Sequence, residues 1–269
     1  MRLAWASDIH LNFIGSTQRR WFIDSIKNQA DALIVSGDIG EGGDICELLN
    51  QIDTLFDKPT YFVLGNHDFY RESVKQTRLM VSKFARETKN LCYLNDNQVI
   101  ELSPTVGLVG HDGFADGRYG DMDRSDVLLS DFSLIKELHC WKRDRLDKSA
   151  LRKALEKLGD EAASHIAFTL QLAVKRYPNV FVVTHVPPFR EAAWHEGHQS
   201  DDDFLPYFAC KAVGDVMLKI ANDNPECKIT VLCGHTHSSG EINITPNLQV
   251  LTASGEYKFP RVHQIFEVS

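Results

Sequence analysis

Five short apolar runs, each followed by residues that can bind a metal ion, limit most strongly what this chain can fold into. The runs cover residues 2–7, 32–37, 60–65, 179–184 and 229–234. Between the first three lie amphipathic patterns at 16–29, 44–56 and 69–88, long enough to form helices that connect parallel strands. The alternation predicts an α/β fold.

The second half of the chain predicts more helices and a strand-rich tail. Residues 148–176 have helical spacing with a candidate break at Gly159, and residues 206–222 predict a helix opened by Pro206. Three short strand patterns follow, joined by turn residues, which favours antiparallel pairing within the tail.

No linker or repeat divides the sequence, so we expect one domain over residues 1–269, with a loop and helical insertion at 112–178. Within that insertion, the Asp- and Gly-rich residues 112–131 predict a long loop.

Composition narrows the partners and the compartment. A net charge of −8 argues against broad electrostatic binding to nucleic acid or to an anionic membrane surface. No stretch approaches the roughly 20 apolar residues that span a bilayer, and the N-terminus lacks a signal-peptide pattern. The six cysteines are scattered without a CxxC pair, which is typical of reduced thiols. We therefore expect a cytoplasmic protein that does not bind membranes.

The polar residues that follow the five runs form a candidate metal site. They are Asp8, His10, Asp38, Asn66, His67, His185, His235 and His237. Ligands of α/β sheets bind beyond the carboxyl ends of the strands, so these side chains are expected at one rim. Asp-x-His and His-x-His place two side chains on the same side of an extended segment, as ligands of one metal or of two adjacent metals. Buried carboxylates and imidazoles need partners, which divalent cations supply.

In chain order the motifs read DIH (8–10), GD (37–38), GNHD (65–68), TH (184–185) and GHTH (234–237). This ordered set resembles the calcineurin-like metallophosphoesterases. The resemblance implies a four-layer α/β/β/α sandwich, in which two mixed sheets carry helices on their outer faces and two metals lie at the strand ends. The implied ligands of the first metal are Asp8, His10, Asp38 and His237. Asp38 would also bridge to the second metal, whose other ligands would be Asn66, His185 and His235.

The resemblance leaves His67 free of metal and close to the substrate phosphoryl group, as a general acid or a hydrogen-bond donor. Asp68 is expected to orient the loop that carries it. Glu41 stands in GDIGE, where many relatives have Asp or Tyr, so a purple acid phosphatase or a protein Ser/Thr phosphatase is disfavoured. A pairing of Glu41 with His67 stays open.

Three further residues are weaker candidates for substrate binding. The planar fork of Arg118 suits a phosphate, although an exposed loop arginine is the commoner outcome. His195 and His198, in HEGH, either border the cleft or are simply solvated.

Together these features predict a dinuclear phosphoesterase that cleaves a phosphomonoester or phosphodiester of a small soluble compound by attack of metal-bridging hydroxide. Mn, Fe and Zn all suit the N/O ligands. One alternative is a repair-type nuclease of the same superfamily, which would need a basic groove. Another is a non-catalytic scaffold for protein binding, although such relatives lose the histidine that corresponds to His67. The sequence indicates no oligomeric state.

Overall fold

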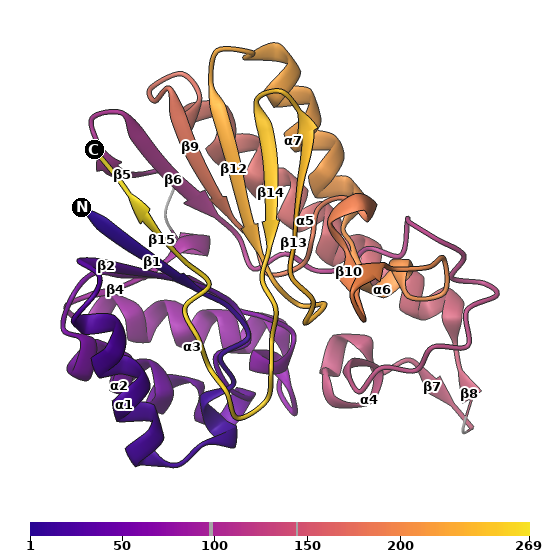
Figure 1. Cartoon of the computed structure of the whole chain (residues 1–269). Helices are drawn as coiled ribbons and strands as arrows, with labels where there is room; N and C mark the ends of the chain where they lie inside the picture. The colour runs from indigo at the N-terminus through magenta and orange to yellow at the C-terminus, as the bar shows by residue number, and fades with distance from the viewer. Residues whose placement is uncertain (97–98, 144) are drawn as a thin grey trace.

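Two mixed sheets face each other between two layers of helices in the computed structural model, which describes residues 1–96, 99–143 and 145–269 (Figure 1). The strand order is β15-β1-β2-β3-β4 in the first sheet and β13-β14-β12-β9-β6-β5 in the second. This arrangement confirms the predicted four-layer α/β/β/α sandwich.

The five apolar runs of the sequence form central strands of the two sheets. They correspond to β1 (Arg2–Ala6), β2 (Ala32–Ser36), β3 (Thr60–Val63), β9 (Asn179–Val183) and β12 (Lys228–Cys233). The remaining strands of the two sheets are β4 (Leu91–Tyr93), β5 (Ile100–Ser103), β6 (Val106–Gly110), β13 (Gly240–Thr245), β14 (Leu248–Thr252) and β15 (Gln264–Glu267). Strands β1 to β4 run parallel, as do β6, β9, β12 and β14.

Helices cover the outer face of each sheet. The first sheet is covered by α1 (Ser16–Lys27), α2 (Ile45–Phe56) and α3 (Val74–Glu87), and the second by α5 (Lys148–Ala173) and α7 (Lys211–Asp223). Between the sheets, a third apolar cluster joins side chains such as Trp5 of β1 and Leu232 of β12. Apolar burial on both faces of each sheet explains why the central strands read as nearly continuous hydrophobic runs.

Two helix predictions need correction. Helix α5 continues through Gly159 without a break. The missing side chain lets the helix pack closely, because a Cβ at Gly159 would lie 2.5 Å from Cβ of Asp116. The helix predicted at 206–222 is two helices, α6 (Leu205–Phe208) and α7, because the backbone is extended at Ala209 and Cys210.

The tail is also not a single antiparallel unit. Strand β13 is antiparallel to β14, but β14 is parallel to β12, and β15 crosses to the first sheet to pair with β1. The residues between β14 and β15 therefore pass from one sheet to the other (Figure 1).

Short elements gather near the carboxyl ends of β9 and β12. They are α4 (Asp131–Leu134), α6, and the hairpin of β10 (Trp194–His195) and β11 (His198–Gln199); a second hairpin, β7 (Trp141–Lys142) and β8 (Arg145–Leu146), lies farther out. Ring contacts join Phe132 of α4 to Tyr207 of α6, and Phe208 of α6 to His195 of β10. Across the described part of the chain, none of the helices has the length and apolar character that a membrane crossing requires.

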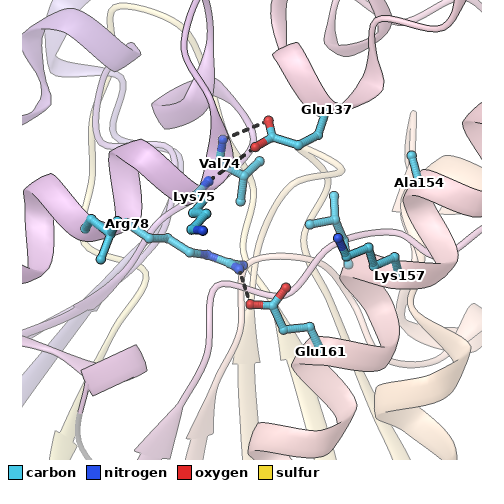
Figure 2. Close-up of a pocket in the computed structure, with 9 residues that line it drawn as sticks. Val74, Lys75, Arg78, Glu137, Ala154, Lys157 and Glu161 are labelled. Carbon is cyan, nitrogen blue, oxygen red and sulfur yellow. Dashed lines mark hydrogen bonds and ion pairs between the residues drawn. The ribbon is translucent and has the colours of Figure 1, made fainter.

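A cavity of about 570 Å³ lies between α3 and α5 (Figure 2). Arg78 spans it, with Nη1 3.0 Å from Oε1 of Glu161 and Nε 2.8 Å from the buried Asp112. Glu137 accepts hydrogen bonds from the backbone N–H groups of Val74 and Lys75, at the start of α3. None of the predicted metal ligands lines this cavity. One ion pair, between Arg78 of α3 and Glu161 of α5, crosses it.

Candidate metal centre

The turns after β1, β2, β3, β9 and β12 meet at one rim, although the strands come from two different sheets. In the first group of side chains, one ligand atom each from Asp8, His10, Asp38 and His237 lies within 4.8 Å of all the others. Nε2 of His237 lies 3.4 Å from Nε2 of His10 and 3.4 Å from Oδ1 of Asp8. Ligands that are each about 2.1 Å from a shared ion are separated by about 3 to 3.5 Å, so this spacing suits a divalent cation.

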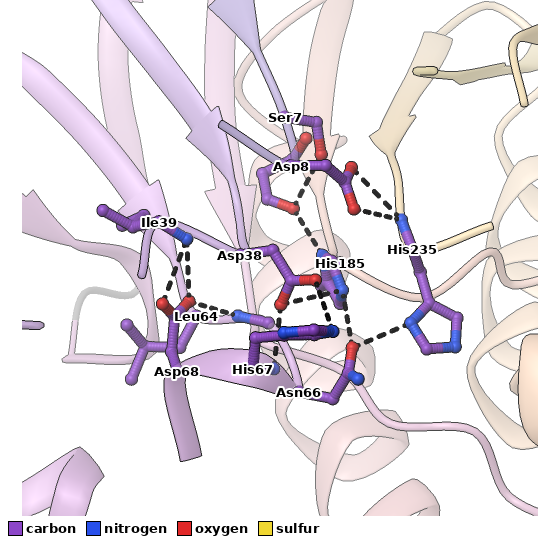
Figure 3. Close-up of polar contacts among 12 residues, drawn as sticks. Ser7, Asp8, Asp38, Ile39, Leu64, Asn66, His67, Asp68, His185 and His235 are labelled. Atoms are coloured by element: carbon purple, nitrogen blue, oxygen red, sulfur yellow. Dashed lines mark hydrogen bonds and ion pairs between the residues drawn. The ribbon is translucent and has the colours of Figure 1, made fainter. Parts of the chain in front are cut away.

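A second group of donors consists of Asn66, His185 and His235, which Figure 3 shows near Asp8 and Asp38 of the first group. Oδ1 of Asn66 is 3.0 Å from Nε2 of His185 and 2.9 Å from Nδ1 of His235. Asp38 joins the two groups: its Oδ1 lies 3.5 Å from Nε2 of His185, and its Oδ2 lies 3.8 Å from Nε2 of His10. One carboxylate thus turns one oxygen toward each group, as a ligand shared by two ions can.

Hydrogen bonds at the far side of each ring fix the tautomers of the second group. Nδ1 of His185 is 2.9 Å from the carbonyl oxygen of Ser36, and Nε2 of His235 is 2.9 Å from that of Tyr207. Carbonyls only accept, so these two ring nitrogens carry the protons. Burial lowers the pKa of both histidines, to about 4 for His235, so both rings are neutral near pH 7.

The amide of Asn66 is fixed in the same way, because its Nδ2 donates to Oδ1 of Asp131 at 2.9 Å. Its Oδ1 must therefore be the atom that faces the two histidines. Three lone pairs, from His185, His235 and Asn66, converge with no hydrogen atom between them. A cation satisfies such a set and a hydrogen bond does not. The residues present therefore fit a metal ion.

The backbone at the ligands differs from the expected extended segments. Five of the predicted ligands have left-handed backbone dihedrals, with φ of 50° at Asp8, 39° at His10, 52° at Asp38, 72° at His235 and 58° at His237. The expectation that i and i+2 spacing on an extended segment aligns these side chains was wrong, because both residues of each pair have left-handed backbone dihedrals. Non-glycine residues in this region are uncommon, and such strain concentrates at functional sites.

Glycines admit the two carboxylates into these turns. A Cβ at Gly65 would lie 2.1 Å from Oδ1 of Asp38, and a Cβ at Gly234 would lie 2.0 Å from Oδ2 of Asp8. Any side chain at either position would displace a ligand.

The electrostatics of the first group also favour a cation. Burial and the neighbouring carboxylates of Asp8 and Asp68 raise the pKa of Asp38 well above its usual value. Burial lowers the pKa of His10 to about 3, so its ring is neutral, and its Nδ1 has no hydrogen-bond partner among the described residues. Buried like charges of this kind are relieved when a positive ion lies among them.

His67 lies next to both groups without joining the convergent set. Its Nε2 is 4.0 Å from Oδ2 of Asp38, and its side chain keeps 15% of its surface exposed. It lines a cavity of about 280 Å³ together with Asp131, His195 and Tyr257. Burial, and then His237, lower its pKa to about 4. The ring is thus neutral near pH 7, with an N–H available to a ligand in the cavity.

Asp68 and Glu41 have different surroundings. Asp68 is buried and accepts backbone hydrogen bonds from Gly40 at 2.8 Å and Gly65 at 2.8 Å, as expected for a residue that orients the ligand turns. Glu41 does not take up the pairing with His67 that the sequence left open. Its carboxylate forms an ion pair with Arg71.

Of the three weaker candidates for substrate binding, only His195 lines the cavity beside the donor groups. His195 lines the cavity, with its ring 5.1 Å from that of Phe208. His198 is exposed on β11 and does not line the cavity. Arg118 lies outside the cavity lining as well, and its guanidinium is bound to Asp116 at 3.0 Å and Asp160 at 2.7 Å. These two carboxylates occupy the fork that was considered for a phosphate.

Sequence reasoning missed three residues beside the predicted ligands, namely Asp131, Tyr70 and Tyr257. Asp131 accepts from Asn66 and also from the hydroxyl of Tyr70 at 2.8 Å. Tyr257 places its ring 4.6 Å from that of His10. The only signal for Asp131 was its position at the end of the long Asp- and Gly-rich loop, and Tyr257 belongs to no motif.

Comparisons with known proteins agree with this fold. The model of the calcineurin-like phosphoesterase family matches residues 1–239. The phosphopantetheinyl hydrolase of Mycobacterium tuberculosis is similar in structure, with a TM-score of 0.64 and 14% identity, over 97% of this chain and 94% of that one. A dimetal phosphatase from Danio rerio has a TM-score of 0.58 at 14% identity, and the match covers 95% of this chain and 87% of that one. The protein TT1561 of Thermus thermophilus has a TM-score of 0.55 at 11% identity, and the match covers 94% of this chain and 89% of that one. No curated protein matches the chain in sequence.

The sandwich of two mixed sheets and the His/Asp cluster at its rim define a metallophosphoesterase type of protein. The chain belongs to the calcineurin-like phosphoesterase family.

Proposed function

We propose that the protein is a metal-dependent phosphoric ester hydrolase that acts on a small phosphorylated compound. The convergence of three lone pairs from His185, His235 and Asn66 carries this proposal, because a cation satisfies that arrangement and a hydrogen bond does not. A pair of divalent ions, with Mn, Fe or Zn suited to the donors, would act as Lewis acids on phosphoryl oxygens and make water more acidic.

The ligand turns would define where the phosphoryl group binds. Asp8, His10 and His237 would hold one ion, and Asn66, His185 and His235 the other, with Asp38 shared between them. The phosphoryl group would then lie in the 280 Å³ cavity, which adjoins both groups and includes His67.

His67 would act on the leaving group. A bound phosphate carries negative charge, which favours the protonated form of a neighbouring imidazole. The protonated ring can then give its Nε2 proton to the leaving oxygen as the bond from phosphorus to that oxygen breaks, while a water oxygen bonds to phosphorus and that water releases a proton to the solvent. A neutral ring can still donate its N–H to a phosphoryl oxygen.

The cavity supports a small substrate over a nucleic acid. No lysine or arginine is among the described residues that line it, whereas nuclease grooves carry basic side chains along the phosphate backbone. The complete set of metal donors supports an enzyme over a scaffold. We further propose a cytoplasmic location, because Cys210, Cys227 and Cys233 are buried free thiols.

Metal analysis followed by paired hydrolysis assays tests the proposal. The purified protein is expected to contain two divalent ions per chain and to cleave p-nitrophenyl phosphate or bis-p-nitrophenyl phosphate. Chelation should stop turnover and added Mn²⁺ should restore it. The relative rates on the two esters would distinguish a phosphomonoesterase from a phosphodiesterase.

Two histidine variants test the site, His185→Ala as the test and His198→Ala as its matched control. The first variant removes a donor of the second group, and the second removes an exposed histidine outside the cavity. Only the first should lose metal and turnover. Hydrolysis that persists at full rate after chelation would overturn the proposal.

A further inference from the structure

Two exposed aromatic rings stand beside the candidate metal centre. Phe13 follows the first ligand pair in a short 3-10 helix, and 41% of its surface is exposed. Tyr257 lies between β14 and β15, and 42% of its surface is exposed. Their ring centroids are 5.0 Å apart at an interplanar angle of 69°. The two side chains are 244 positions apart in the sequence (257 − 13), so the fold itself creates this pair.

The pair is continuous with the first group of metal donors. The ring of Tyr257 is 4.6 Å from that of His10 and 5.2 Å from that of His237. The ring of Phe13 is 6.0 Å from that of His10. Tyr257 also lines the 280 Å³ cavity. An aromatic surface therefore extends from the edge of the candidate metal site outward to solvent.

Packing alone does not account for this surface. His10, against which both rings lie, is already fully buried, yet each of the two rings keeps about two fifths of its surface in water. Large aromatic side chains release more free energy when they are buried than when they are left exposed, so an exposed pair at the mouth of a site indicates a surface for binding. Phe208 and His195 add two further rings to the lining of the same cavity, 5.1 Å apart.

We propose that Phe13 and Tyr257 form an aromatic platform that binds a planar ring carried by the phosphate ester, so that the substrates are aryl or heteroaryl phosphate esters. This inference rests on the proposed function, because the phosphoryl group must lie at the metal pair for its ester group to reach the platform. Stacking or edge-to-face contact with such a ring is favourable whatever its substituents, whereas an alkyl group gains less.

Binding of two phosphonates, which the enzyme cannot hydrolyse, tests the platform. Dissociation constants of phenylphosphonate and methylphosphonate are measured by calorimetry on the metal-loaded protein. The wild type should bind phenylphosphonate more tightly. Phe13→Ala and Tyr257→Ala should each reduce this preference by about 3- to 10-fold, while binding of methylphosphonate stays unchanged. Tyr257→Phe keeps the ring and should keep the preference.

Phe259→Ala is the matched control, because Phe259 is an aromatic residue on the same segment with 64% of its surface exposed and no place in the cavity lining. Its preference should equal that of the wild type. The metal content of every variant is measured alongside.

Two results would overturn the platform alone. One is a wild type that binds both phosphonates equally well. The other is a Tyr257→Ala variant that loses affinity equally for both, which would mean that the ring only shields the metal ligands. A metal-loaded wild type that binds neither phosphonate would instead contradict the proposed function.

Discussion

Nδ2 of Asn66 lies 2.9 Å from Oδ1 of Asp131, and this hydrogen bond decides which end of the amide faces His185 and His235. Without it the amide is free to rotate and present N–H groups to the metal. We expect Asp131→Ala to weaken binding of one of the two ions by about 10- to 100-fold, as is usual when a partner of a metal ligand is lost. Competition titration with a chromogenic chelator measures this. Asp126→Ala, an exposed change in the same loop, should have no effect.

The placement of His67 predicts that catalysis and metal binding can be separated at this residue. Its ring lines the cavity but does not belong to the convergent donors. We expect His67→Ala to lower kcat by ~10²- to 10⁴-fold while both ions are retained. Steady-state kinetics and elemental analysis of the same sample give the two readings. If the variant lost metal, His67 would be a ligand and our assignment would be wrong.

Asp38 should behave in the opposite way, because its two oxygens face different donor groups. Replacing it with Asn removes the negative charge shared by both positions, so Asp38→Asn should deplete both ions. Elemental analysis after dialysis against metal-free buffer checks this. Full occupancy of either position would argue against a bridging role.

Arg78 makes a prediction about stability. Its Nε bonds to the buried Asp112, which also accepts from the hydroxyl of Tyr93 at 2.7 Å. Arg78→Met would leave this carboxylate without its cation, at a cost of about 3 kcal/mol in the free energy of unfolding. Lys219→Met, which removes an exposed helical ion pair with Asp223, should cost less than about 0.5 kcal/mol. Urea denaturation distinguishes the two; equal losses would contradict the expectation.

The stability of the metal-free protein should depend on pH through His111. Burial, and then the charge of Arg78, lower its pKa well below 6.5. The unfolded chain therefore takes up a proton near pH 6.5 that the folded chain does not, and stability is lost as the pH falls below that value. In His111→Asn, whose side-chain oxygen can still accept from the N–H of Gly113, this contribution is absent. Thermal unfolding between pH 7.5 and 5 should show a smaller fall in Tm than in the wild type. An identical fall would refute this.

Much of the fold could be predicted from the sequence because its central strands are buried on both faces. The runs that became β1, β2, β3, β9 and β12 carry that burial directly as uninterrupted apolar residues. The destination of β15 could not be predicted in this way, because pairing with β1 depends on contacts between the two ends of the chain. The extent of the single domain over residues 1–269 stays a prediction.

The candidate site was likewise predictable only in part. The grouping of the candidate ligands could be predicted because strand ends place them at one rim. Their backbone conformation could not, since left-handed dihedrals at Asp8 or His237 are set by the surrounding packing. Asp131 and Tyr257 act through spatial contacts alone. Each lies far in sequence from the ligand it touches, so no spacing rule reveals it.

Each donor group draws side chains from both sheets: Asp8 and His10 from the first sheet meet His237 from the second, and Asn66 from the first meets His185 from the second. The layer between the sheets is apolar and has little directional preference, so by itself it tolerates small sliding movements. An ion bound by either group would crosslink the two sheets at this rim. Conversely, a change in shape deep between the sheets, far from any ligand, would be transmitted to the ions as a change in how well their ligands fit.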